Sequence, residues 1–244
     1  MGLHICYDLS LPGETPGARI LEVLGELRTL ASRPGVRVTP MLQVTLATLL
    51  SKPPFVWHNL DRFFPFWASL QLRERDGTVE YRDADRDRIT AIGFAIHPGH
   101  GSEAATFGFV RPLVETPASD AEVPEKCGAW YWHACCKTQY ASVVSDEHLV
   151  RCHLLIVELL EALQRLGVEV DVRDETGYWE TRSTARLITE VAKMNAIVAR
   201  FAGAFHDAMP PGLRAGGAIF EHPEFERLET DGGKNRGGKT ETGP

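Results

Sequence analysis

The sequence predicts an α+β fold: a mostly antiparallel sheet with helices packed mainly on one face, and an aromatic insertion around residues 45–72. Two observations lead to this prediction. Segments that alternate apolar with polar or small residues recur along the chain, as expected of strands with only one face against helices. Three long segments have apolar residues at helical spacing. We expect one domain over residues 1–230, followed by a disordered tail over 231–244 that is rich in glycine, lysine and threonine.

Composition and charge exclude some classes of protein. The chain has 244 residues, 43% of them hydrophobic, and a net charge of -7, with no stripe of Lys and Arg. It therefore lacks the footprint of a nucleic-acid binder. Its longest apolar tract, 154–163, is interrupted by Glu158 and Glu161, which indicates a buried helix and no membrane segment. Because the N-terminus resembles no secretory signal and the cysteine count is odd, we expect a cytoplasmic protein with reduced thiols.

The first half of the chain begins with a strand whose two faces differ clearly. Its apolar face carries Leu3, Ile5, Tyr7 and Leu9, and its polar face carries His4, Cys6, Asp8 and Ser10. A helix over 16–32 follows, since Thr15 and Pro16 suit a helix start and Pro34-Gly35 suits its end. A second strand is predicted over 36–44. Beyond it, large aromatic residues interrupted by prolines predict a short helix and the aromatic insertion.

The second half is more regular. A hairpin is predicted from strands 89–97 and 106–113, and a cysteine-containing strand over 129–139. Helices are expected over 146–166 and 184–208, with an amphipathic strand around 168–172 between them. The buried stripe of the last helix is predicted to be Leu187, Val191, Met194, Val198, Phe201 and Phe205.

The polar faces of these strands predict a shared open surface. Small residues at Ala91, Gly93 and Ala95, followed by His97, would form its floor, and the polar face of the first strand would flank it. A ligand can approach such a floor closely, and so can an aromatic cover from the insertion. Strand order decides whether these residues converge, and the sequence does not give it.

Cys135 is the first candidate for chemistry. His133, Cys135 and Lys137 share one face of their strand, and neighbours on that face are about 6.6 to 6.8 Å apart. A nearby cation favours a nucleophilic thiolate, so His133 would act as base or orienter and Lys137 as electrostatic partner. The more common explanation is a solvated sheet face with an incidental thiol. A vicinal disulfide with Cys136 is not expected, because alternation sends the two side chains to opposite faces.

A metal site is the second candidate, with Cys152 and His153 joined by Cys135, His133 or His4 as possible zinc ligands. No paired ligand motif occurs, and Cys152 and His153 fall on apolar sides of their helix. The helical positions therefore favour a hydrogen-bonded core histidine, and we assign no metal ligand. The sequence identifies no cofactor.

A loop after the last strand carries Asp174, Glu175 and Tyr178. Carboxylates at a strand end, backed by aromatics, are typical of a binding loop, so these three residues join His4 and His97 as candidate ligand-binding residues. They are equally typical of a turn in which the aspartate bonds its own backbone while Trp179 anchors the next helix. The turn is the interpretation we favour.

Three segments resemble an uncharacterised bacterial protein family. They read CKTQYAS over 136–142, VRCHL over 150–154 and DETGYWE over 174–180. The resemblance covers most of the chain from about Ile89 onward. It implies no assigned activity, fold or ligand, so no residue role follows from it.

Two classes of function remain open. The first is a ligand-binding protein or thiol-dependent enzyme that uses the open sheet face around Cys135. The second is a non-catalytic interaction or regulatory protein whose partner surface is the aromatic insertion around Trp57 and Trp67. A small molecule or a protein is the expected partner in either case, and the oligomeric state is left open. Convergence of His4, His97, His133 and Cys135 would favour the first class, and their scatter the second.

Overall fold

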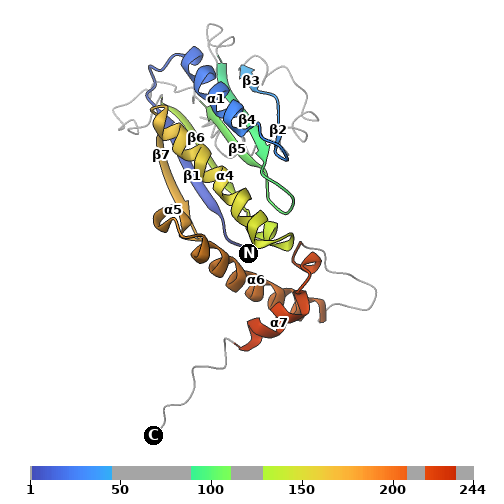
Figure 1. The fold of residues 1–244 in the computed structure, drawn as a ribbon. Coiled ribbons are helices and arrows are strands. Elements are labelled where there is room, and N and C mark those ends of the chain that lie inside the picture. The colour runs from blue at the N-terminus through green and yellow to red at the C-terminus, as the bar shows by residue number, and fades with distance from the viewer. Residues whose placement is uncertain (1, 46–88, 111–128, 208–217, 235–244) are drawn as a thin grey trace, which may run out of the picture.

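A computed structural model describes residues 2–45, 89–110, 129–207 and 218–234 and confirms the α+β fold (Figure 1). The strands are β1 (Ile5–Leu11), β2 (Arg37–Val38), β3 (Leu42–Thr45), β4 (Ile89–His97), β5 (Ala105–Val110), β6 (Trp130–Cys136) and β7 (Glu169–Asp174). The α-helices are α1 (Gly17–Ala31), α4 (Asp146–Arg165), α5 (Tyr178–Thr181), α6 (Thr184–Asp207) and α7 (Phe225–Lys234), with 3-10 turns η4 (Gln139–Val143) and η5 (Ala218–Glu221). The aromatic insertion lies outside the described residues.

All seven strands belong to one antiparallel sheet in the order β2-β4-β5-β6-β1-β7, with β3 also paired to β4. The N-terminal strand β1 thus lies between β6 and β7, which come from the second half of the chain. The single strand predicted over 36–44 is two short strands separated by Thr39–Met41. Pro40 has no N–H to donate to a strand ladder. At the break, the Thr39 N–H donates to the Ala95 carbonyl oxygen of β4, and the Thr39 hydroxyl oxygen accepts a hydrogen bond from the Ala95 N–H.

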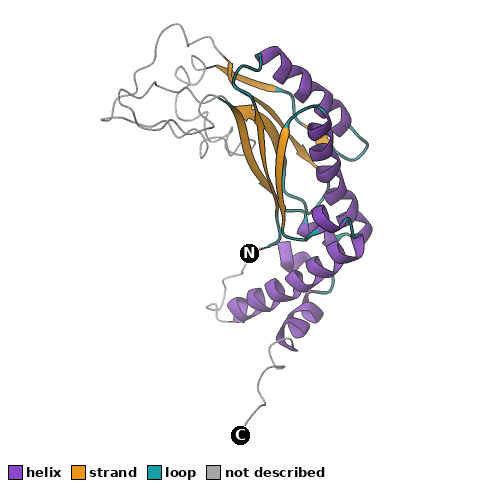
Figure 2. Cartoon of the chain, turned by 90° about the vertical axis from the view of Figure 1, so that its left-hand side faces the viewer, coloured by secondary structure: helices purple, strands orange, loops and turns teal. Residues whose placement is uncertain are grey.

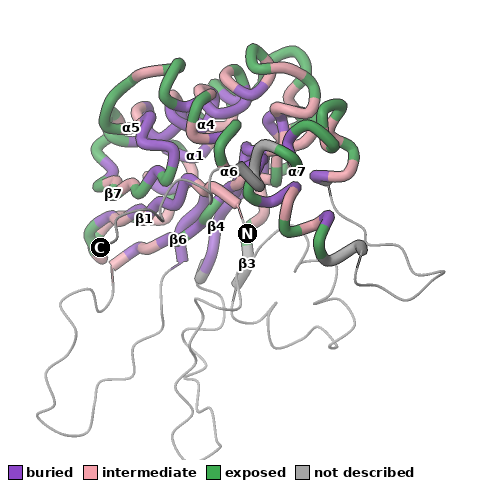
Figure 3. The backbone as a smooth tube through the Cα atoms, turned by 90° about the horizontal axis from the view of Figure 1, so that it is seen from below, coloured by how far each residue is buried: buried purple, intermediate pink, exposed green. Residues whose placement is uncertain are grey.

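Helices cover one face of this sheet, as the sequence predicts (Figure 2). Ile20, Leu24, Leu27 and Ala31 of α1 lie at helical spacing and are buried, and so is the apolar face of β1. Ser145 caps α4 by accepting a hydrogen bond from the His148 N–H, beside acidic residues in the first turn. The strands and helices facing each other form one continuous core (Figure 3). None of the described helices is long and apolar enough to cross a membrane.

Aromatic residues hold the middle strands together inside this core. The Tyr7 ring stacks on Phe107 with centroids 5.3 Å apart. The Tyr7 hydroxyl and the Trp132 indole N–H both donate to the carbonyl oxygen of Thr106, at 2.7 and 3.0 Å. Burial raises the pKa of Tyr7 well above its ordinary value, so the phenol remains a donor at all ordinary pH values. These contacts hold β1 and β6 against β5 on the buried side of the sheet.

The second half of α6 packs with α7 in a smaller apolar cluster of its own. The predicted stripe of α6 is confirmed at Leu187, Val191 and Val198 but is wrong at Phe201, which is 61% exposed. The smaller Ala199 takes the buried position instead, because the stripe shifts around the helix once the packing partners change from α4 and α5 to α7. Helix α7 ends at Lys234, so the boundary predicted at residue 230 falls inside it. Residues 235–244 lie outside the described part.

Candidate functional site

The pairing of β1 with β6 and with β7 lines up polar residues across three strands. Residues directly opposite each other in a sheet share a face. Cys6 of β1 lies opposite Cys135 of β6 and Arg173 of β7. In the next row, Asp8 lies opposite His133 and Asp171. We call these two rows together the open-face site; they lie on the side of β1 opposite its buried apolar face.

A disulfide joins Cys6 and Cys135 across the first row, closing a sequence separation of 129 residues. Their Cα atoms are 4.0 Å apart, in keeping with the closely spaced type of antiparallel pair. The expectation that all cysteines are reduced is therefore wrong for these two. The physical reason is the strand pairing: two cysteines far apart in sequence become direct neighbours only once β1 is placed beside β6.

The two cysteines of the disulfide differ in how far they are exposed to solvent. Cys135 is exposed, whereas Cys6 is only 7% exposed. His133 Nε2 lies 3.9 Å from Cys135 Sγ, and His133 Nδ1 lies 3.0 Å from Asp8 Oδ1. Because the carboxylate can only accept, Nδ1 carries the hydrogen and a neutral imidazole turns its Nε2 lone pair toward the sulfur. Asp8, His133 and Cys135 therefore form a chain of contacts ending at an accessible sulfur.

Tyr131 adds a second donor to Asp8, with its hydroxyl 3.2 Å from the same Oδ1. Burial and the neighbouring Asp8 raise the pKa of Tyr131 to about 12, so this hydroxyl keeps its hydrogen. Two donors thus hold the Asp8 carboxylate against His133. Asp8 has a role in the site that the sequence analysis did not assign, although alternation already placed it on the polar face of β1. The missing information was which strand pairs with β1.

The other predicted residues lie around this centre to different degrees. Lys137 follows β6 and turns its Nζ toward Glu103 Oε1 at 3.5 Å, away from any described contact with Cys135. His4 precedes β1 and pairs with Glu175, with 3.3 Å between Nδ1 and Oε2. His97 lies on β4, opposite Arg37 of β2, where burial and the nearby guanidinium lower its pKa. Of the four residues whose convergence would favour the first class of function, the structure brings His133 and Cys135 together, places His4 two residues before Cys6, and leaves His97 on β4, apart from β6.

The small-residue floor, for which the sequence left both a ligand and a cover possible, is buried at Ala91 and Ala95. Ala91 and Ala95 lie opposite Val110 and Thr106 of β5, and Val110 lies opposite Tyr131 of β6, which sets the shared face. Ala91 and Ala95 are nonetheless buried, as is Thr106. The face is therefore accessible over β1, β6 and β7 but not over β4. Alternation identified the face correctly, but it cannot tell how much of a face is covered.

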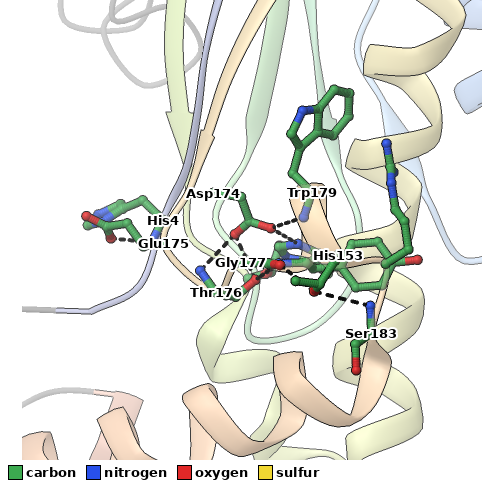
Figure 4. A network of polar contacts seen from close by, with 12 residues as sticks. His4, His153, Asp174, Glu175, Thr176, Gly177, Trp179 and Ser183 are labelled. Carbon is green, nitrogen blue, oxygen red and sulfur yellow. Dashed lines mark hydrogen bonds and ion pairs between the residues drawn. The ribbon is translucent and has the colours of Figure 1, made fainter.

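A second His–Asp pair lies in the core (Figure 4). His153 of α4 has its Nε2 3.2 Å from Asp174 Oδ2 and its Nδ1 3.0 Å from the Thr138 hydroxyl. The His153 and Asp174 side chains are 1% and 0% exposed. Nε2 donates to the carboxylate, and Nδ1 lies within hydrogen-bond distance of the Thr138 hydroxyl. We call Thr138, His153 and Asp174 the buried network; it ties the end of β6, helix α4 and the end of β7 together.

Asp174 also organises the loop that follows it. Its Oδ1 accepts hydrogen bonds from the Thr176 N–H and hydroxyl, and its Oδ2 accepts one from the Trp179 N–H at 2.9 Å (Figure 4). Gly177 adopts a left-handed conformation with φ 69°, which suits glycine. The prediction of a self-bonded turn anchoring the next helix is confirmed. Tyr178 is buried with its ring edge-on to His153, and Glu175 is exposed and bound to His4.

The buried network is strongly polarised. Burial alone would raise the pKa of Asp174, but hydrogen bonds and charge from His153 and hydrogen bonds from Thr176 outweigh it and hold the pKa at about 2. The prediction that His153 is a hydrogen-bonded core residue is confirmed. These groups have no exposed atom to offer a substrate, so the network stabilises the fold.

Two further described cysteines, Cys136 and Cys152, are free and buried. The expectation that Cys135 and Cys136 face opposite sides is confirmed. Burial, followed by nearby Glu103, raises the pKa of the Cys136 thiol far above its ordinary range, and burial also raises that of Cys152. Both are therefore poor nucleophiles. Cys127 lies outside the described residues.

In the disulfide form, the described part of the chain holds no group of three or more His, Cys, Asp or Glu side chains placed to bind a metal ion. Comparison with protein-family models, curated proteins and solved structures finds no match. The resemblance to an uncharacterised bacterial family stays a prediction.

Proposed function

We propose that the protein is a thiol-dependent enzyme that carries out thiol–disulfide exchange on the open sheet face. Cys135 is the sulfur that reacts with substrate, and Cys6 is the resolving cysteine. One observation carries the proposal: the exposed Cys135 is bonded to Cys6 and lies 3.9 Å from His133 Nε2, whose other nitrogen is held by Asp8. Buried structural disulfides lack both an accessible sulfur and a positioned base.

The reaction starts from the reduced protein. His133 Nε2 takes the proton of the Cys135 thiol, and the thiolate attacks one sulfur of a substrate disulfide. That substrate S–S bond breaks, the first thiolate leaves with a proton, and a mixed disulfide forms on Cys135. The Cys6 thiolate then attacks Cys135 Sγ, and the second substrate thiolate leaves and is protonated. Two electrons have passed from the dithiol to the substrate, and the Cys6–Cys135 bond has formed.

The neighbouring residues take distinct roles. His133 is the catalytic base because it contacts the reacting sulfur, and Asp8 is a positioning residue because it acts through His133. Asp8 also stabilises the imidazolium that forms when His133 takes the proton. Lys137 adds positive charge at the end of β6, although its contact with Glu103 makes it a lesser contributor than predicted. Arg173, opposite Cys6, favours the thiolate of the resolving cysteine.

We also propose a cytoplasmic location, as the sequence predicts. Disulfides in reducing compartments are usually transient and belong to catalysis or redox sensing. A disulfide on an exposed sheet face beside a His–Asp pair fits that description better than it fits a permanent cross-link. The two free, buried cysteines are consistent with a chain that is not stabilised by a disulfide framework.

The experiment follows the reduced protein with oxidised glutathione as the substrate disulfide, using intact mass and rapid quenching. Wild type is expected to return to the intramolecular disulfide with release of two glutathione molecules. Cys6→Ser is expected to stop at a mixed disulfide on Cys135, because the resolving sulfur is gone. His133→Ala is expected to slow the first step by about 10²-fold.

Cys136→Ala is the matched control, since Cys136 is the adjacent cysteine on the opposite, buried face. It is expected to react like wild type. A wild-type rate no faster than that of a free cysteine thiol would contradict the proposal. So would a Cys6→Ser protein whose glutathione is found on Cys136 or Cys152 instead of Cys135.

A further inference from the structure

Reduction of the disulfide changes what the open-face site can bind. The two sulfurs of a disulfide are weak metal donors, but two thiolates are strong ones. Cys6 and Cys135 lie directly opposite each other on adjacent strands, and His133 Nε2 points at Cys135 Sγ. Opening the bond therefore places two thiolates and an imidazole lone pair on one patch of the sheet. This is a set of three ligands that the oxidised protein does not possess.

The distances suit a tetrahedral ion with thiolate and imidazole ligands. Zinc binds thiolate sulfur at about 2.3 Å and imidazole nitrogen at about 2.0 to 2.1 Å, so neighbouring S and N ligands stand about 3.5 Å apart. Cys135 Sγ and His133 Nε2 are 3.9 Å apart already. The two sulfurs must separate to about 3.8 Å in such a site. They do so once the bond is broken, because unbonded sulfur atoms repel each other at the disulfide distance.

The second shell of such a site is already in place. Metal-binding histidines commonly give their other ring N–H to a carboxylate, which fixes the tautomer and strengthens the donor nitrogen. His133 gives Nδ1–H to Asp8 Oδ1 at 3.0 Å, and Tyr131 holds the same oxygen. Asp171 lies opposite Asp8 on β7, so a second carboxylate adds to the negative potential of the patch. Arg173 adds one positive charge opposite Cys6, but the two thiolates and two carboxylates together carry more negative charge than it balances.

We propose that the reduced protein binds one Zn²⁺ ion through Cys6 Sγ, Cys135 Sγ and His133 Nε2, with Asp8 holding His133. Three protein ligands leave the fourth position to water or a substrate group. The inference rests on the proposed function in one respect: the disulfide must open to the dithiol. It does not require exchange with any substrate. The oxidised protein cannot hold the ion, so metal binding and disulfide formation exclude each other.

The zinc-bound dithiol and the zinc-free disulfide interconvert by exchange of protons, electrons and the ion. When Zn²⁺ binds, two thiols lose their protons. When a low-molecular-weight disulfide oxidises the loaded site, its S–S bond breaks, the Cys6–Cys135 bond forms and two electrons pass to the oxidant. The resulting two thiolates take up two protons, and Zn²⁺ leaves. The site would thus release zinc under oxidising conditions.

The test measures metal binding by the full chain in both redox states. The protein is reduced, freed of reductant and metal, and titrated with Zn²⁺ against a chromophoric chelator. Co²⁺ is used in parallel, because a tetrahedral site with sulfur ligands gives intense visible absorption. We expect one ion per reduced chain and none per oxidised chain. This comparison uses wild type alone, so it holds even if a variant fails to fold.

Variants then locate the ion. Cys6→Ser, Cys135→Ser and His133→Ala are expected to weaken Zn²⁺ binding at least 100-fold, and Asp8→Asn 10- to 100-fold. Cys136→Ala and Cys127→Ser are the controls and are expected to bind like wild type. Equal binding in both redox states, or full binding by Cys6→Ser, would overturn the proposal. Loss of binding in either control variant would also overturn it, because the ion would then lie elsewhere.

The exchange assay in excess chelator separates this inference from the proposed function. If exchange proceeds but the reduced protein binds no zinc, the metal inference fails alone. If zinc binds with the expected variant pattern but glutathione exchange is no faster than that of free cysteine, the proposed function fails alone. Resistance of the disulfide to strong reductant would overturn both.

Discussion

The described part of the chain contains two His–Asp pairs of nearly the same geometry in opposite surroundings. On the open face, His133 and Asp8 are 3.0 Å apart with side chains 44% and 43% exposed. In the core, His153 and Asp174 are 3.2 Å apart with side chains almost wholly buried. Asp8 also accepts a hydrogen bond from Tyr131, Asp174 also accepts three from Thr176 and Trp179, and each histidine keeps one ring nitrogen for a third group. That third group is an accessible sulfur in the first case and the buried Thr138 hydroxyl in the second.

The difference shows that burial, not the residue pair, decides what such a pair does. An exposed pair gains little free energy, about 0 to 1 kcal/mol, but it can meet a substrate and exchange protons with water. A buried pair that loses one partner leaves a charge without solvent, which costs about 3 to 5 kcal/mol. The open-face site is therefore suited to chemistry and the buried network to stability. Unfolding measurements on variants of each region can therefore tell the two roles apart.

The largest stability effect on the open face should come from the covalent bond instead of the ion pair. Reducing Cys6–Cys135 is expected to lower the free energy of unfolding by about 3 to 5 kcal/mol, because the bond closes a loop spanning 129 residues of sequence separation. Urea unfolding with and without reductant measures this. Cys135→Ser cannot form the bond, so reductant should not change its stability. A wild-type change under 1 kcal/mol would show that strand pairing alone holds this face together.

Removing the histidine from each pair gives the next largest effect. His153→Ala is expected to destabilise the fold by about 2 to 4 kcal/mol, since it leaves a cavity and an unpaired Asp174. His133→Ala is the matched variant and should change stability by no more than about 0.5 kcal/mol. Thermal or urea unfolding of both proteins is the measurement. Similar losses in the two variants would contradict the division of roles.

Acid should weaken the buried network selectively. The pKa of folded Asp174 is about 2, below its ordinary value of 3.8, because hydrogen bonds from His153 and Thr176 outweigh burial. A depressed pKa contributes stability that is fully present above about pH 4 and is lost as pH falls through about 2. We expect this contribution to be about 2 kcal/mol. The stability difference between wild type and Asp174→Asn should shrink by that amount between pH 4 and pH 2; a constant difference would contradict it.

The sequence predicted the buried network better than the open-face site, and the reason is locality. Asp174 bonds to residues two and five positions ahead, and His153 sits on an apolar helix face, so local rules identified the turn and the core histidine. Cys6 and Asp8 were assigned to the right face of β1 by alternation. Their partners Cys135 and His133 are more than 120 residues away, and only strand order brings them together.

Other outcomes follow the same rule. The three long helices α1, α4 and α6 were predicted nearly to the residue from periodicity, capping and glycine or proline signals, whereas α7 was not predicted. Phe201 was misplaced because the apolar stripe of α6 changes partner midway, from α4 and α5 to α7. Whether Ala91 and Ala95 are covered was left open, because alternation reports the face of a residue and not what lies over it. In each case the missing information was a tertiary neighbour.

The smallest expected effect provides the most direct test of the exposed pair. Asp8→Asn should leave the free energy of unfolding within about 0.5 kcal/mol of wild type, because the pair is exposed and the amide oxygen can still accept from His133 Nδ1. The substitution also removes one of two like charges, since Asp8 lies directly opposite Asp171. Asp174→Asn is the counterpart and should cost about 1 to 3 kcal/mol: its two oxygens accept from different N–H groups, and an amide can replace only one of them. Urea unfolding near pH 7 compares the two. A loss above 1 kcal/mol in Asp8→Asn would mean that the open-face carboxylate holds the sheet together, and its role in positioning His133 would no longer be separable from the fold.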